Sequence, residues 1–297
     1  MAKSKSFFGL RTGSTKSLTF QVNAGKQITK DRVSIVKNPR SLAQMQQRML
    51  LATVSAAYSA MKLIVDHSFE GVAYGQKSMS EFVKLNMQKI TADFNGAGDK
   101  FGYNEYKNRL FHAGPYAISR GSASPIDTAK ITATAGAASQ TLAIAAAGTA
   151  SANPTANQLA AALGLQVGEM CTIVVLVDAL TEASEAYDKF TFVRIKFDAA
   201  GDVALSDANI GSYFTIECPQ ELTLTLAATG LTIAIGLSAA GTSICFAAIH
   251  SVKADGAWLR SDCDIILPGS WEIAPSPEQA IATYPIGSDY ILNGGNF

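Results

Sequence analysis

The chain has 297 residues, which is long enough for two domains and a well-buried core. Charged residues make up 16%, below the roughly 25% usual in soluble proteins, so other subunits are expected to cover part of the surface. The formal net charge of +0 excludes a uniformly basic or uniformly acidic protein.

The charge is nevertheless sorted along the chain. Residues 1–120 contain 18 Lys+Arg and 7 Asp+Glu, a net of +11, whereas residues 121–297 contain 6 and 17, a net of −11. Opposed electrostatic fields of this kind steer association between molecules. The asymmetry therefore predicts a binding partner for the basic part, either nucleic acid or the acidic part of a neighbouring copy.

The first elements expected are a basic arm and a hairpin. Residues 1–14 are rich in Ser, Gly and cations and lack the continuous apolar run of a signal peptide. Apolar and polar positions alternate over 16–22 and 26–36, on either side of Asn23-Ala24-Gly25. This alternation around a turn sequence predicts a β-hairpin.

Two helices are expected after the hairpin, with a short third one over 104–111. Capping boxes of Ser41 with Gln44 and of Ser78 with Glu81 predict helices from about 41 to 66 and from 78 to about 94. The first helix carries two apolar stripes, which predicts that it is packed on two sides. The stripes consist of Leu42, Met45, Met49, Ala52, Ala56, Ala60 and Leu63, and of Leu50, Val54, Ala57, Met61 and Ile64.

From about Ala129 the composition shifts to Ala, Thr, Gly and Val. Short apolar runs separated by turn signals predict a β-sandwich, and Asn157 is expected to cap a brief helix to Gly164. The expected strands are 130–135, 141–146, 169–178, 190–197, 213–218, 222–227, 231–235, 243–252 and 258–267.

Together these elements predict an α+β fold in three parts. Residues 1–125 hold the basic arm, the β-hairpin and the helices, and 126–270 hold an acidic, mostly antiparallel β-sandwich-like domain. Residues 271–297 are rich in Pro and aromatic side chains and are expected to form an extended C-terminal tail that docks on its own domain or on a neighbour.

One uncharged stretch, 222–249, is long enough to cross a bilayer as a helix. Its beginning, Leu222-Thr223-Leu224-Thr225-Leu226, alternates with a period of two, and three glycines interrupt the remainder. This pattern indicates strands, so no membrane partner is expected.

The sequence lacks the motifs that are typical of phosphate-binding, catalytic and metal-binding sites. The segment from Gly9 to Lys16 lacks the spacing of a phosphate-binding P-loop, and no Ser or Cys stands in a catalytic signature. The three histidines lie in different elements, and the four cysteines are best explained as buried, reduced thiols. We therefore expect no enzyme, no catalytic or metal-binding residue and no cofactor.

Asp262 and Asp264 are the one carboxylate pair that alternation places on the same face of a strand. Such a pair could act in acid–base catalysis or bind Ca²⁺. A solvated strand face is the more common explanation, and it is the one adopted here.

The basic N-terminal segment is the one remaining feature of the sequence that indicates a binding function. Its cations are interleaved with phenylalanines, which suits single-stranded nucleic acid through stacking and phosphate contact. Alternatively, Phe7 and Phe8 anchor the arm in a neighbouring copy. The candidate interface or phosphate-contact residues are Lys16, Lys26, Lys30, Arg32, Lys37, Arg40 and Arg48.

Three stretches taken together resemble a known family. They are Lys37-Asn38-Pro39-Arg40 continuing through Gln44, Gln47 and Arg48, then Asp188-Lys189-Phe190-Thr191-Phe192-Val193-Arg194, and Ala257-Trp258-Leu259-Arg260-Ser261. In this order they resemble largely uncharacterised proteins of Bacteroidetes bacteria and their gut phages. The resemblance implies a phage or prophage context and, within it, a virion or assembly component; it does not extend to 129–168.

The leading hypothesis is a non-enzymatic structural protein of a phage virion, assembled in the cytoplasm of the bacterial host. Its basic N-terminal half would contact the acidic β-domain of the next copy head to tail, with other virion proteins as further partners. One alternative is a nucleic-acid-binding packaging or accessory protein that uses the same cations. Another is a surface carbohydrate-binding β-domain with Trp258 or Trp271 as its platform.

Overall fold

The computed structural model describes residues 12–15, 18–23, 26–31, 42–96, 114–136, 138–146, 152–177, 189–237 and 244–266. The chain folds as two compact units, Met1–Ser41 and Leu42–Phe297. The arm anchors Phe7 and Phe8, the third helix expected near 104–111 and the tail over 271–297 lie outside the described residues.

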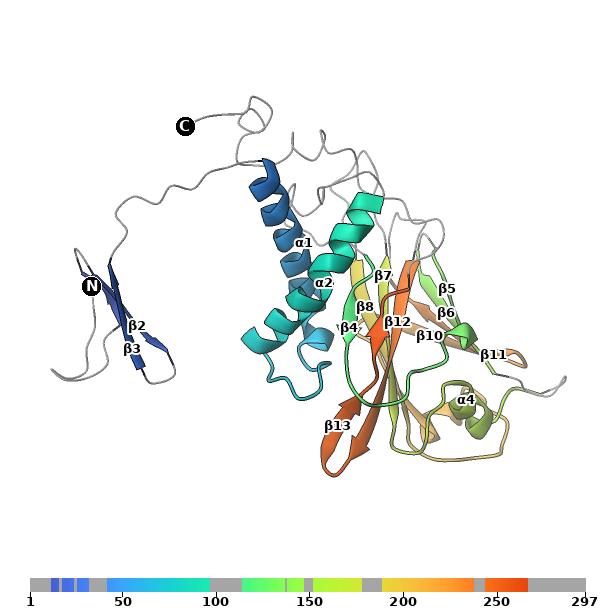
Figure 1. Ribbon diagram of the computed structural model, residues 1–297. Helices are drawn as coiled ribbons and strands as arrows, with labels where there is room; N and C mark the ends of the chain where they lie inside the picture. Colours follow the sequence, from blue (N-terminus) through green and yellow to red (C-terminus); the bar gives the residue numbers. More distant parts are fainter. Residues whose placement is uncertain are drawn as a thin grey trace. The chain divides into compact units, whose positions relative to one another are not determined.

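The N-terminal unit contains a three-stranded antiparallel sheet in the order β1-β2-β3 (Figure 1). Its strands are β1 Gly13–Ser14, β2 Leu18–Asn23 and β3 Lys26–Asp31. Leu18 pairs with Asp31 and Asn23 with Lys26, so β2 and β3 form the expected hairpin, and β1 adds a short third strand beside β2.

The second unit begins with two helices, α1 (Leu42–Val65) and α2 (Gln76–Gly96). Two antiparallel sheets follow, a five-stranded one in the order β13-β12-β7-β8-β9 and a four-stranded one in the order β10-β11-β6-β5. The strands of the larger sheet are β7 Met170–Val177, β8 Lys189–Phe197, β9 Phe214–Glu217, β12 Ile244–Ala254 and β13 Ala257–Arg260.

The smaller sheet consists of β5 Ile131–Thr134, β6 Gln140–Ala145, β10 Leu222–Ala227 and β11 Gly230–Ile235. A short pair, β4 Ala117–Ser119 with β14 Cys263–Asp264, lies beside the helices. The remaining elements are the helix α4 Ala156–Ala162 and two single 3₁₀ turns, Thr128–Lys130 and Ile210–Ser212.

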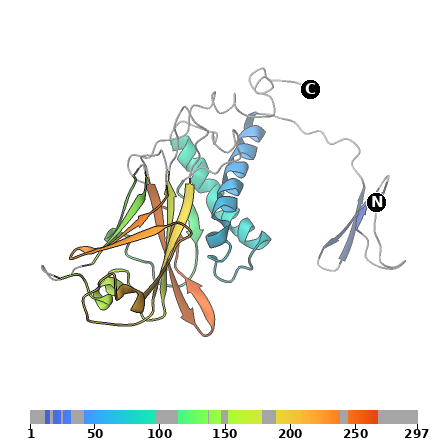
Figure 2. The same cartoon turned by 180° about the vertical axis from the view of Figure 1, so that it is seen from behind.

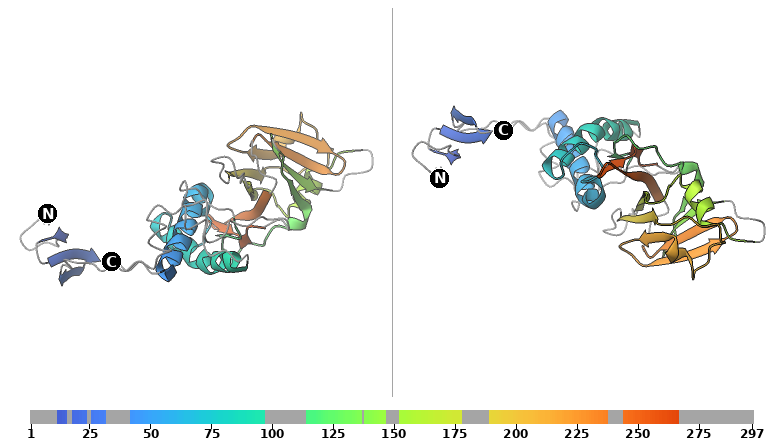
Figure 3. Two further views of the ribbon diagram at one scale, coloured as in Figure 1. Left: turned by 90° about the horizontal axis from the view of Figure 1, so that it is seen from above. Right: turned by 90° about the horizontal axis from the view of Figure 1, so that it is seen from below.

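These elements form three layers around two hydrophobic cores. Alternate side chains of β7, such as Ile173 and Val175, face the four-stranded sheet and pack with Leu142 and Ile233. The intervening side chains, such as Val174, face α1 and α2. Figures 2 and 3 show the helices and the four-stranded sheet on opposite sides of the five-stranded sheet.

Burial on both faces explains why β7 is a continuous apolar run, Met-Cys-Thr-Ile-Val-Val-Leu-Val, whereas β10 alternates Leu and Thr. The fold class predicted from sequence, α+β with a mostly antiparallel β-sandwich, is therefore confirmed. The sequence-based division grouped the helices with the basic arm in 1–125, whereas in the structure they share a core with the sandwich.

Two helix starts differ from the expectation. α2 begins at Gln76, two residues before Ser78, because the buried Ser78 hydroxyl donates a hydrogen bond to the carbonyl of Val65 at the end of α1 (3.2 Å). α4 is capped by Thr155 and not by Asn157, since the Thr155 side chain accepts from the Gln158 N–H and the Gln158 side chain accepts from the Thr155 N–H.

Candidate functional site

The N-terminal sheet presents two chemically different faces. Strand pairing and alternation place Leu18, Phe20 and Val22 on one face, and Lys26 and Lys30 on the other. Both lysines are exposed, and the three apolar side chains are only half-buried. No side chain of this sheet whose exposure is described is buried, so the sheet has no core of its own.

The structure thus brings two of the candidate interface residues, Lys26 and Lys30, together on one strand face. Arg48 lies half-buried in α1 and belongs to the second unit. The other candidates lie outside the described residues; they are Lys16, Arg32, Lys37, Arg40 and the arm anchors Phe7 and Phe8.

Helix α1 has a second apolar side that the described part of the protein covers incompletely. The stripe that contains Val54, Ala57 and Met61 is buried against α2 and the five-stranded sheet. On the other stripe Ala52 is exposed and Leu63 is 66% exposed. The expected packing on two sides is therefore met on one side within the described residues.

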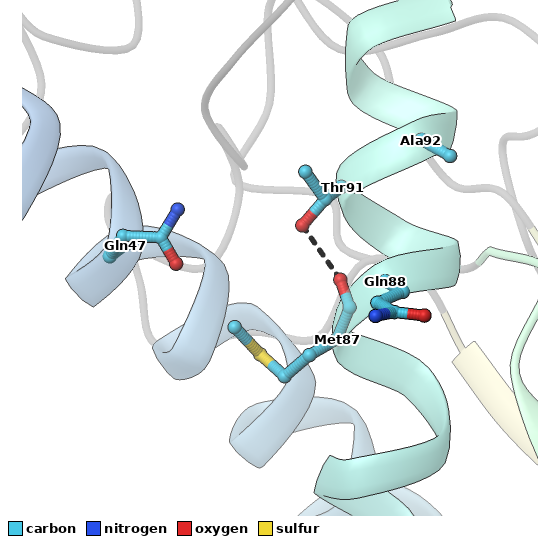
Figure 4. Close-up of a pocket in the computed structure, with 5 residues that line it drawn as sticks. All are labelled: Gln47, Met87, Gln88, Thr91 and Ala92. Carbon is cyan, nitrogen blue, oxygen red and sulfur yellow. Dashed lines mark hydrogen bonds between the residues drawn. The ribbon is translucent and has the colours of Figure 1, made fainter.

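A pocket of about 320 Å³ lies between the two helices and is shown in Figure 4. Gln47 of α1 and Met87, Gln88, Thr91 and Ala92 of α2 line it. The Thr91 hydroxyl donates a hydrogen bond to the Met87 carbonyl (2.7 Å), as Figure 4 shows. None of these side chains ionises near neutral pH, so the pocket offers no acid–base pair.

The single strand expected over 258–267 is wrong: the structure has two short strands there, β13 and β14, in different sheets, and Asp262 lies between them. Both carboxylates of the pair make structural contacts. Asp262 accepts a hydrogen bond from the Gly121 N–H (2.9 Å), and Asp264 forms ion pairs with Lys89 and with Arg120 (2.7 Å). Partial burial would raise the pKa of Asp264, but the hydrogen bonds from Lys89 and Arg120 outweigh it and lower that pKa. Within the described residues no three His, Cys, Asp or Glu side chains converge as a metal site would require.

The cysteines of the described strands behave as small apolar residues. Cys171, Cys245 and Cys263 are buried, and Cys218 is half-buried. Burial raises the pKa of Cys171 and raises that of Cys263 to about 12, which keeps both thiols protonated.

The buried His250 side chain makes two polar contacts that the sequence did not predict. Its Nδ1 lies 2.8 Å from the Ser124 carbonyl oxygen, and its Nε2 lies 3.0 Å from Oε2 of Glu169. Both ring nitrogens therefore lie within hydrogen-bond distance of an oxygen acceptor. The side chains are 7% and 14% exposed, and the contact joins β12 to the residue that precedes β7.

A second charged surface, also not foreseen, lies on the helix-facing side of the five-stranded sheet. Alternation places Arg194 and Lys196 of β8 on the same side as Phe192, and Lys253 of β12 on the same side as Ile249. Arg260 of β13 lies opposite Ser251 on that side. We call Arg194, Lys196, Lys253 and Arg260, together with Trp258, the cationic face.

The cationic face gathers four of the six cations that follow residue 120. It lies where the sheet extends past the helices, at the end that carries β13 in Figure 1. Strand alternation within β8 was the available signal for Arg194 and Lys196. The Asp255-Gly256 turn sequence was the available signal for the pairing of β13 with β12. The position of β8 in the same sheet could not be read from the sequence.

Comparison with family models, with curated proteins and with solved structures finds no match to the chain. Among the described helices, none combines the length and the apolarity that a membrane crossing needs.

Proposed function

We propose that this protein is a non-enzymatic structural protein that assembles with copies of itself through its N-terminal sheet. The observation that carries the proposal is the absence of any buried side chain in the described part of that sheet. The sheet is a hairpin of two six-residue strands with a two-residue third strand, and because none of its described side chains is buried, it is at best marginally stable alone. A partner that covers Leu18, Phe20 and Val22 supplies the missing burial.

Charge supports a head-to-tail arrangement. The N-terminal sheet exposes Lys26 and Lys30, whereas the β-sandwich exposes acids such as Asp202, Asp207 and Glu221. Complementary surfaces on different parts of one chain generate a heterologous interface, which builds rings or filaments. The exposed stripe of α1, with Leu63, is a further surface that assembly can cover.

The place of this assembly in a phage particle rests on the family resemblance alone. It makes other virion proteins the further partners and the bacterial host cytoplasm the site of assembly. Detection of the protein in purified particles by mass spectrometry tests this part separately from self-association.

The test of assembly is charge reversal with a matched control. Replacing Lys26, Lys30 and Arg32 with Glu is expected to abolish oligomers in size-exclusion chromatography with light scattering, while circular dichroism remains unchanged. The control replaces the exposed Lys62, Lys77 and Lys130 with Glu, which changes the net charge equally, and is expected to assemble normally. Oligomers that survive the first substitution contradict the proposal, and loss of oligomers in the control as well would assign the effect to net charge alone.

A second candidate function is nucleic-acid binding, because Lys26 and Lys30 present two exposed ammonium groups on one strand face. It predicts a monomer that shifts in size only when single-stranded DNA is added. Binding through phosphate contacts also weakens steeply with salt, in proportion to the number of contacts. Large oligomers in the absence of DNA favour the structural role.

A further inference from the structure

The cationic face carries positive charge that the described part of the chain does not fully neutralise. Arg194 pairs with Glu217 (3.2 Å) and Lys196 with Asp198, whereas Lys253 has no carboxylate partner among the described residues. Arg194 also has a buried Nε without a hydrogen-bond acceptor.

Arg260 adds a second unbalanced charge. Its guanidinium donates only a long hydrogen bond, to the Leu259 carbonyl (3.4 Å), among the described contacts. Burial lowers the pKa of Arg260, and the positive charge of Arg194 on the same face of the sheet lowers it further. A nearby anion would relieve this repulsion.

An aromatic ring stands between the two unpaired cations. Strand pairing sets Trp258 directly opposite Lys253, and the Arg260 guanidinium lies 5.5 Å from the centre of the Trp258 ring. Trp258 is 39% exposed in a hairpin that turns at Asp255 and Gly256, both with positive φ. The combination suits a ligand that carries both carboxylates and apolar or aromatic groups.

The C-terminal segment 267–297 of the same chain has this chemistry. It contains three acidic residues, Glu272, Glu278 and Asp289, and no Lys or Arg. It also contains four aromatic side chains, Trp271, Tyr284, Tyr290 and Phe297.

The segment can reach the cationic face. The described chain ends at Ile266, whose backbone is hydrogen-bonded to Phe246 near the start of β12. Seven residues of strand separate Phe246 from Lys253, roughly 24 Å at 3.4 Å per residue. The twelve residues from Ile266 to Glu278 span at most roughly 40 Å when extended, so Glu278 and later residues lie within range.

We propose that the C-terminal segment 267–297 binds to the cationic face of its own chain, with its carboxylates against Lys253 and Arg260 and its apolar side chains against Trp258. Covalent connection favours the chain's own segment over that of another copy, because it keeps the effective concentration high. The proposal does not rest on assembly through the N-terminal sheet, and either can fail without the other.

The test follows the exposure of Trp258 in the full-length chain. The chain has two tryptophans, so a Trp271→Phe background leaves Trp258 as the only one. In that background, Glu272→Lys, Glu278→Lys and Asp289→Lys together are expected to raise acrylamide quenching of Trp258 to the level of an uncovered side chain. Each exposed ion pair changes the bound-to-unbound ratio by up to about fivefold, so loss of the two pairs within reach, those of Glu278 and Asp289, shifts it by up to about twenty-five-fold.

Two further variants complete the test. Reversal of the exposed Asp202, Asp207 and Glu221 to Lys, with the same charge change, is expected to leave the quenching unaltered. Adding Lys253→Glu and Arg260→Glu to the segment reversal is expected to restore protection, because the signs are exchanged on both sides.

Three results would overturn the proposal. The first is equal quenching in the segment-reversal variant and its parent. The second is protection that disappears on dilution, which assigns the contact to a neighbouring copy. The third is protection that appears only when heparin or single-stranded DNA is added, which assigns the face to an external polyanion.

Discussion

Each of the two units contains an antiparallel sheet, and the sheets differ in how much of their surface is buried. The five-stranded sheet is covered by helices on one face and by a second sheet on the other, and seven of the eight residues of β7 are buried. The three-stranded N-terminal sheet has no described side chain that is buried. The first sheet is stabilised by two cores of the second unit, whereas the described residues supply no such core to the N-terminal sheet.

The largest expected effect on the free energy of unfolding comes from comparing the substitution of one phenylalanine in each sheet's unit. Phe82 is fully buried between the rings of Tyr58 and Tyr116, at 5.7 Å from each. Phe82→Ala is expected to lower the free energy of unfolding by about 3–5 kcal/mol in urea denaturation. Phe20→Ala is expected to change it by less than about 0.5 kcal/mol while weakening self-association. An equal loss of stability for Phe20→Ala would contradict the conclusion that the N-terminal sheet has no core.

A smaller effect is expected where a buried amide joins α2 to β4. Asn86 Nδ2 donates to the carbonyls of Phe82 (2.9 Å) and Ala117 (3.0 Å), and its Oδ1 accepts from the Ala117 N–H (2.6 Å). Asn86→Ala leaves the buried Ala117 groups without partners, so the free energy of unfolding is expected to fall by about 2–3 kcal/mol. The exposed Gln88→Ala on the same helix serves as the control, and a loss as large as that of Asn86→Ala would contradict the assignment.

The smallest expected effect is the loss at low pH of the stability that Asp264 contributes. The folded-state pKa of Asp264 is lowered, so its stabilising contribution is present above the unfolded value of about 3.9 and is lost as the pH falls through the folded pKa. Because its side chain is 48% exposed, solvent screens the contact and the contribution is below about 1 kcal/mol. Urea midpoints of wild type and Asp264→Asn should differ at pH 6 and converge below pH 3.9. A constant difference across this range would contradict the assignment.

Most of the strands were predictable because the burial of a strand produces a local pattern of apolar residues. The continuous apolar run of β7 and the alternation of β10 each specify how many faces are covered. Helix starts were less predictable, because a serine such as Ser78 can cap a helix or bond to a neighbouring one. That choice depends on the end of α1, a tertiary contact that no local pattern records.

The two charged surfaces also differ in how far local sequence patterns predict them. The hairpin pattern was sufficient to place Lys26 and Lys30 on one face. The cationic face required knowledge of strand order. Arg194 and Arg260 are far apart in the chain and share one face of the sheet because β8 and β13 belong to the same sheet, with β7 and β12 between them. Short elements such as β4, with three residues, left no periodic signal.

The shared central sheet has a consequence for how the second unit loses its structure. Because β7 and β12 contribute alternate side chains to both cores, neither the helices nor the four-stranded sheet can detach without exposing one face of the same strands. Melting of the second unit should therefore be a single calorimetric event, and its central-strand amides should exchange with deuterium only through that event.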